Sequence, residues 1–309
     1  MGPCDFVIMI TQMMSVNYQT LPTEQRNPRS KHVDRVSLQK LISIMNKEDA
    51  SVASVVKKAT PAIEKAILQI TSSLKNKGRL FFIGAGTSGR LGVIEAAECP
   101  PTFGTPPSLV QALMAGGKQA VFRSKEGDED KGSEAQRIVR KKLRTEDILV
   151  GIAASGVTPY VRSALLTAKK RKIKTILVTC HPGVSAKWAD VVIALKTGPE
   201  VVTGSTRLKA GTATKLVLNM LTVGSMVQLG KVYGHLMVDV QPKSKKLVAR
   251  AVGLISYLGD VSEKQAQTLL RLSKKNVKTA IVMARKKVGY KKAAQLLRES
   301  HGHLYRILS

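Results

Sequence analysis

The fold is decided by residues 79–89, which read Arg79-Leu-Phe-Phe-Ile-Gly-Ala-Gly-Thr-Ser-Gly89. The mainly apolar run at 79–83 is too short for a helix and is followed by glycines, which predicts a buried β-strand. The glycines allow a tight turn that exposes backbone N–H groups where the next helix begins. A strand, a glycine turn and a helix in this order form the first unit of an α/β fold.

Short apolar runs alternate with helical patterns after this unit. The strand-like runs are residues 109–113, 148–153, 175–179 and 191–195. The helical patterns cover about 88–98, 132–143 and 159–170. Such alternation is typical of a parallel sheet with helices on both faces. We therefore expect an α/β fold with a doubly wound, mainly parallel sheet, whose ligands bind beyond the carboxyl ends of the strands.

Three regions are expected along the chain. Residues 1–33, which are polar from about Ser15 onward, are interpreted as an N-terminal arm or extension. The sheet and the helices that precede it should occupy 34–240, because apolar residues recur at helical spacing from Asp34. Residues 241–309 are interpreted as a small C-terminal helical module. No apolar run reaches the roughly 18 residues of a membrane span, so no membrane association is expected.

The chain of 309 residues carries a net charge of +29. Its lysines and arginines are spread along the sequence, and aromatic residues that would stack on bases make up only 4%. We therefore expect solvated basic helix faces and no specific nucleic-acid partner. The three cysteines, Cys4, Cys99 and Cys180, lack zinc-ligand spacing, so no metal site is expected. This use of cysteine fits a reducing cytoplasm.

The glycine turn formally matches the GxGxxG fingerprint of dinucleotide sites. That fingerprint needs an acidic residue about twenty positions further on to hold the ribose, and no Asp or Glu occurs between Cys99 and Lys125. A single phosphate or a sugar oxygen suits the turn better. The exposed amides and the helix N-terminus attract an anion, and Thr87 and Ser88 add hydroxyl groups.

A second hydroxyl-rich turn follows the strand at 148–153. Gly156 permits a sharp bend, and Ser155 and Thr158 stand where the next helix opens. Simple N-capping by Ser or Thr would account for these residues equally well. Because the carboxyl ends of parallel strands share one edge of the sheet, two such turns favour a phosphate site.

Two glutamates near these turns are candidates for proton transfer. Glu98 precedes Pro100, and the prolines predict that its helix ends there. Glu129 lies in the acidic stretch 126–130. Each also has a structural alternative, as an exposed helix-end glutamate and as a solvated turn charge respectively. Carboxylates beside a phosphate site would suit an enzyme that acts on a phosphorylated small molecule.

Several longer strings resemble the N-acetylmuramic acid 6-phosphate etherases, a family of sugar isomerase (SIS) domains. The resemblance covers nearly the whole chain from about Thr23. The matching strings are residues 23–28, 84–92, 97–102, 126–130, 151–160, 200–212 and 236–240. Such strings are far more specific than a glycine turn. The chain departs from the family pattern at Asp128, in its lysine content and in an extension before about Ser15.

The resemblance implies a cytoplasmic lyase that acts in cell-wall sugar recycling. Its substrate would be N-acetylmuramic acid 6-phosphate, and cleavage of the D-lactyl ether would give N-acetylglucosamine 6-phosphate and D-lactate. The family's two acid/base residues map onto Glu98 and Glu129, for elimination and then hydration. Together with the four hydroxyl residues of the two turns, they make up the expected site. The chemistry needs no metal and no organic cofactor.

Two other classes of protein are built on the same domain. The vertebrate glucokinase regulatory protein shares it as a sugar-phosphate-responsive binder, so a non-catalytic sensor is the main alternative. An aldose–ketose isomerase is a further one. Neither would release lactate.

The resemblance also implies a homodimer, and the predicted helix gives a reason for a shared active site. Ser88 and Glu98 are ten residues apart, which places them roughly 15 Å from each other along a helix. A sugar phosphate spans only about half that length between phosphorus and C3. We therefore expect Glu98 to serve a pocket of the partner chain.

Overall fold

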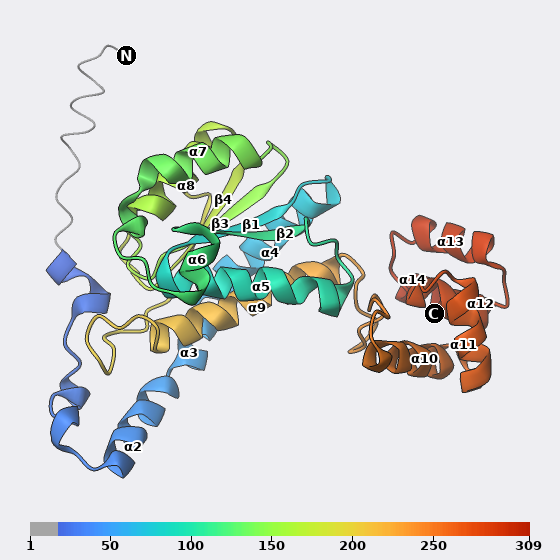
Figure 1. Cartoon of the computed structure of the whole chain (residues 1–309), viewed down its shortest axis with the longest axis horizontal. Coiled ribbons are helices and arrows are strands. Elements are labelled where there is room, and N and C mark those ends of the chain that lie inside the picture. Colours follow the sequence, from blue (N-terminus) through green and yellow to red (C-terminus); the bar gives the residue numbers. More distant parts are fainter. Residues whose placement is uncertain (1–17) are drawn as a thin grey trace.

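A five-stranded parallel sheet forms the centre of the protein, which is described by a computed structural model over residues 18–309 (Figure 1). The strands are β1 (Leu80–Gly84), β2 (Val110–Met114), β3 (Ile148–Ile152), β4 (Lys174–Thr179) and β5 (Val191–Ala194). Their order is β2-β1-β3-β4-β5, and all neighbouring pairs are parallel. The predicted α/β fold with its parallel sheet is confirmed.

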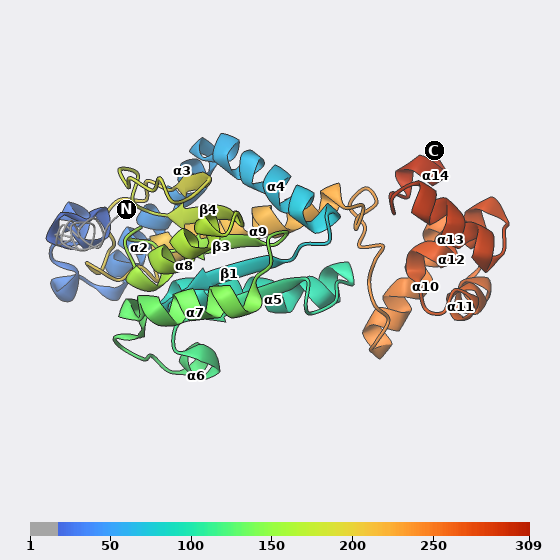
Figure 2. The same cartoon turned by 90° about the horizontal axis from the view of Figure 1, so that it is seen from above.

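Both faces of the sheet are apolar and covered by helices. Phe82 and Val150 belong to the core on one face, and Phe81 and Leu149 to the core on the other, as the period of a strand requires. The helices of the first face are α4 (Thr60–Lys75), α5 (Gly86–Phe103) and α9 (Lys209–Gln228), and those of the second are α7 (Gly132–Lys142) and α8 (Pro159–Lys170). Figures 1 and 2 show the resulting three layers.

Helix α5 is longer than the sequence predicts. It continues through Pro100 and Pro101 to Phe103 and ends at Gly104, whose φ is +64°. Each proline removes one helical donor but has a φ that a helix accepts, so the loss is confined to the last turn. Buried Phe103 and the bond from the Gly104 N–H to the Pro100 carbonyl (3.0 Å) hold that turn in place. The prediction that the helix ends at Glu98 was therefore wrong.

The C-terminal part of the chain is helical and has an apolar cluster of its own. Its helices are α10 (Lys245–Gly259), α11 (Glu263–Leu272), α12 (Val277–Lys286), α13 (Tyr290–Glu299) and α14 (Tyr305–Leu308). Lys278 joins it to the sheet domain, because its ammonium lies 2.8 Å from Asp239 and donates to the carbonyl of Gly230 at 3.2 Å. Within residues 18–309, no helix is long and apolar enough to cross a bilayer.

The N-terminal segment is a series of 3₁₀ turns followed by two helices. The turns are Tyr18–Thr20, Pro22–Glu24, Pro28–Ser30 and Val33–Arg35, and the helices are α2 (Leu38–Asp49) and α3 (Val52–Lys58). The helix expected from Asp34 thus begins later, where the Ser37 hydroxyl accepts from the Lys40 N–H at 3.2 Å. The extension predicted before about Ser15 lies outside the described residues.

A buried charge cluster ties this segment to the sheet domain. The carboxylate of Glu48, on α2, is 1% exposed and is paired with Arg29 from the N-terminal segment and with Lys209 at the start of α9. Burial opposes its ionisation, but hydrogen bonds from Lys209 and Arg29 outweigh burial and lower the pKa of Glu48. Glu200 accepts the N–H groups of Lys209 (3.1 Å) and Ala210 (2.9 Å), which satisfies two free donors of the helix.

Replacing Glu48→Gln should lower the free energy of unfolding by about 3–5 kcal/mol, because it leaves the buried Lys209 ammonium without its partner. Urea unfolding at neutral pH measures the change. Since the folded-state pKa is lowered, the ionised carboxylate stabilises the fold above its ordinary pKa of 4.5. That contribution is lost as the pH falls further, and the variant should not show this loss.

Asp34→Asn provides the control, because Asp34 pairs with Arg35 on the surface and should contribute about 0.5 kcal/mol or less. If the two variants were equally stable, the charge cluster would not carry the stability assigned to it.

Candidate active site

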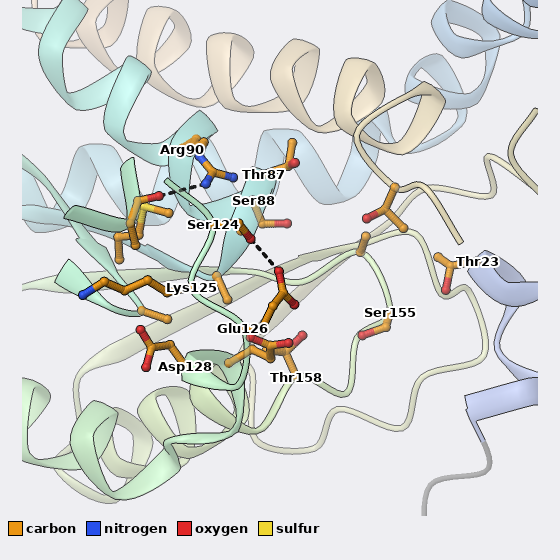
Figure 3. Close-up of a pocket in the computed structure, with 18 of the residues that line it drawn as sticks. Thr23, Thr87, Ser88, Arg90, Ser124, Lys125, Glu126, Asp128, Ser155 and Thr158 are labelled. Atoms are coloured by element: carbon orange, nitrogen blue, oxygen red, sulfur yellow. Dashed lines mark hydrogen bonds between the residues drawn. The ribbon is translucent and has the colours of Figure 1, made fainter. Parts of the chain in front are cut away.

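A cavity of about 320 Å³ opens at the carboxyl edge of the sheet (Figure 3). It lies where β1 and β3 end, which is the edge at which the sequence predicts ligand binding. Further walls come from the N-terminal segment and from the loop before α9. The lining segments are residues 21–24, 85–90, 114–129, 154–158 and 204–206, each through some of its members.

The first glycine turn starts α5 close against the sheet. A Cβ atom on Gly84 would lie 2.7 Å from the backbone nitrogen of Gly89, so only glycine permits this approach. The N-cap residue, Ala85, has no side chain that could bond the first free N–H groups of α5. Thr87 and Ser88 stand in this first turn, and both line the cavity. The turn thus offers amides and hydroxyls to an anion.

The second turn has the same features at the start of α8. Gly156 has a φ of +75°, and a Cβ atom there would lie 2.9 Å from the Thr179 hydroxyl oxygen. Thr158 is the N-cap residue, but its side chain makes no capping hydrogen bond and lines the cavity instead. Ser155 accepts the Val157 N–H at 3.3 Å and also lines the cavity. Capping therefore does not account for Thr158.

Glu129 reaches the same cavity from the turn Asp128–Asp130. Its side chain is half-buried, whereas Asp128 is buried beneath it and paired with Lys131. Glu126, which is exposed, accepts from the Ser124 hydroxyl at 2.6 Å (Figure 3). The structure thus brings Glu129 together with the four predicted hydroxyl residues.

Glu98 is not among the residues that line this cavity. It is exposed on α5, one turn beyond Ile94, which is itself 51% exposed. Since α5 is one continuous helix, Glu98 lies roughly 15 Å along it from Ser88. One chain therefore does not bring the two predicted glutamates together.

The lining residues that were missed by reasoning from the sequence include three from segments without a predicted turn. Thr23 and Glu24 come from the N-terminal segment, and Thr206 comes from the loop before α9. All three belong to strings that carry the family resemblance. Their place in those strings was the available signal, because neither segment has a glycine turn that follows a strand.

The cavity holds more acidic than basic side chains. Its carboxylates are Glu24, Glu126, Asp128 and Glu129, and its cations are Arg90 and Lys125. The Arg90 guanidinium donates to the carbonyls of Ala120 and Val121, each at 2.9 Å, and so fixes the short helix α6 (Gly117–Phe122). An anion in this cavity would depend mainly on amides and hydroxyls.

A buried carboxylate lies one turn before Glu98 on α5. Glu95 is 5% exposed, accepts from the Thr222 hydroxyl at 2.7 Å and is bonded by the Asn219 amide, both on α9. Burial is the largest cause that raises its pKa, while these two bonds and the charge of Lys215 oppose the rise. Glu95 thereby holds α5 against α9 three residues before Glu98.

Comparison with known proteins places this fold in the SIS class. The family model described as "SIS domain" matches residues 130–224, and the one described as "Glucokinase regulatory protein N-terminal SIS domain" matches 62–169. The protein is thus built on a SIS domain.

Full-length relatives define the family within this class. The chain is 47% identical over 287 residues to the N-acetylmuramic acid 6-phosphate etherase of Gloeothece citriformis, covering 92% of this chain and 94% of that one. It is 46% identical over 298 residues to the etherase of the same name from Clostridium beijerinckii, covering 96% and 98%. The chain belongs to the N-acetylmuramic acid 6-phosphate etherase family, and it is a carbon–oxygen lyase.

Glu95→Gln should change how stability depends on pH. Because the folded-state pKa of Glu95 is raised above its ordinary 4.5, burying the charged form costs free energy at neutral pH. This cost disappears as the pH falls towards 4.5, so the difference in unfolding free energy between wild type and variant should shift in favour of the wild type on acidification. Urea unfolding at several pH values measures it.

The matched control is Glu64→Gln, an exposed glutamate on α4. The difference in unfolding free energy between wild type and variant should change more with pH for Glu95→Gln than for the control. An equal change for the two variants would contradict the assignment.

Proposed function

We propose that the chain cleaves the D-lactyl ether of N-acetylmuramic acid 6-phosphate in the cytoplasm, giving N-acetylglucosamine 6-phosphate and D-lactate. The observation that carries the proposal is identity of 45–47% to etherases over more than nine-tenths of the chain. The cavity adds chemical support, because its two turns offer a phosphate cradle and Glu129 offers an acid/base group beside it.

The reaction proceeds by elimination and then by addition of water. In the open-chain sugar the C1 aldehyde acidifies the proton on C2, and a base removes it. The C3–oxygen bond then breaks, and the departing lactate oxygen takes a proton because an alkoxide is a poor leaving group. Water adds its oxygen to C3, and C2 regains a proton. The sum is one water consumed and one ether bond replaced by two hydroxyl groups.

Two glutamates carry these proton transfers in the proposal. Glu129 exchanges the proton at C2, which its place on the cavity wall supports. Glu98 protonates the leaving lactyl oxygen and then assists the attacking water. Ser155, Thr158 and Ser88, with Thr87 and the adjacent amides, hold the phosphate.

A homodimer with a shared active site would bring Glu98 to a cavity. Support comes from exposed apolar side chains, since large apolar side chains rarely cluster on the outside without a partner. One groove is lined by Leu68 on α4 and by Met220, Val223 and Val227 on α9, each at least 44% exposed, and Ile94, four residues before Glu98 on α5, is 51% exposed. In the proposal, the second copy covers these side chains and brings the Glu98 end of its own α5 to the first cavity.

The central test is lactate release by the purified protein supplied with N-acetylmuramic acid 6-phosphate. Wild type should form D-lactate, whereas Glu98→Gln and Glu129→Gln should each slow release by about two to four orders of magnitude, as expected for lost acid–base catalysis. Asp130→Asn, next to Glu129 but outside the cavity lining, should retain activity.

Binding of the sugar phosphate without lactate release would identify a sensor instead. Formation of a ketose phosphate without lactate would identify an isomerase. Near-normal turnover in either glutamate variant would remove that residue from the mechanism.

A mixing experiment tests the shared site. One inactive chain carries Glu98→Gln, and the other carries Ser155→Ala with Thr158→Ala. In the heterodimer one site would have both defects and the other would have neither, so subunit exchange should restore up to half of the wild-type activity per dimer. Absence of recovery, with heterodimers shown by mass spectrometry, would mean that each site is built from one chain.

A further inference from the structure

The N-terminal segment contributes a carboxylate that has no role in the chemistry above. Glu24 ends the 3₁₀ turn Pro22–Glu24, and its N–H donates to the Leu21 carbonyl at 2.9 Å. Leu21 and Thr23 are each 3% exposed, whereas Glu24 is exposed and lines the cavity. The buried neighbours fix the backbone, so the carboxylate is directed at the cavity rather than carried by a loose tail.

A second anchor holds this turn against the adjoining wall of the cavity. The Asn27 amide, 4% exposed, donates to the Pro199 carbonyl at 3.2 Å, at the base of the loop that supplies Gly204 and Thr206. Gly204 has a φ of +78°, and a Cβ atom there would lie 3.0 Å from a carboxylate oxygen of Glu24. The carboxylate thus rests on the backbone of Gly204, in space that a side chain would fill.

The charge of Glu24 is not neutralised within residues 18–309. None of the ion pairs of these residues includes it, and its carboxylate accepts one long hydrogen bond, from the Thr23 hydroxyl at 3.4 Å. A free carboxylate repels the phosphate and the lactyl carboxylate of the proposed substrate. It can offset this only by accepting hydrogen bonds, since an ionised carboxylate has no donor.

We propose that Glu24 is a substrate-binding residue that accepts hydrogen bonds from the hydroxyl groups of the sugar chain. The inference rests on the proposed function for the identity of the sugar. A charge-assisted bond of this kind is among the stronger hydrogen bonds in proteins. The same negative charge would select for a neutral, hydroxyl-bearing part of the ligand at this wall and against a second anionic group. The N-terminal segment is then part of the binding site and not only a support for it.

The test compares Glu24→Ala and Glu24→Gln with wild type. Glu24→Ala should raise KM for the phosphorylated sugar about tenfold or more, with kcat within about threefold, because the bond is formed in the ground state and kept in the transition state. Glu24→Gln keeps a neutral acceptor and should lie between the two. Asp34→Asn, an exposed acid of the same segment outside the cavity, is the matched control and should leave KM unchanged.

A binding measurement separates a direct contact from collapse of the cavity. Calorimetric titration with N-acetylglucosamine 6-phosphate should show weaker binding for Glu24→Ala, whereas inorganic phosphate, which needs only the two turns, should compete as well as in wild type. Loss of both sugar-phosphate and phosphate binding would mean that the cavity collapses in the variant. Unchanged or tighter binding of the sugar phosphate would mean that the carboxylate makes no favourable contact with it. Each of these results would overturn the proposal. Because titration needs no turnover, it gives a result for Glu24 even where wild type releases no lactate.

Discussion

The position of one buried carboxylate constrains most of the site. Glu48 lies between Arg29 and Lys209, and removing two charges from water is tolerated only where the geometry of the pair is well defined. Lys209 begins α9, whose first amides are bonded by Glu200. This cluster of charges therefore links the N-terminal segment and α2 to α9 and the loop before it. It thereby fixes the position of two walls of the cavity.

The predicted elements that matched the structure best are those with strong local signals. The helix expected over 159–170 was found as Pro159–Lys170, because a proline suits its first turn and the strands on either side are largely buried. The end of α5 was missed for the opposite reason. Pro100 is a strong local stop signal, but burial of Phe103 and closure by Gly104 carry the helix past it. Tertiary packing decided that boundary.

The residues of the candidate site also differ in whether a local signal or tertiary packing determines their position. Ser88, Ser155 and Thr158 directly follow strands of a parallel sheet, so topology alone places them at one edge. The sequence could not place Thr23 and Glu24 on the cavity wall, because their segment carries no strand or helix period. Their position depends on contacts such as the bond between Asn27 and Pro199, which joins residues 172 apart in the sequence.

This long separation has a consequence for how the protein is made. The N-terminal segment leaves the ribosome before the sheet domain, but its anchors are Pro199 and, through Glu48, Lys209, which lies 161 residues after Glu48. Domains fold as units during synthesis, and contacts of high sequence separation form late. The wall of the cavity that is synthesised first can therefore take its place only after one of the last strand-to-helix connections of the sheet domain has been synthesised. A nascent chain that stops before α9 therefore cannot form the complete cavity.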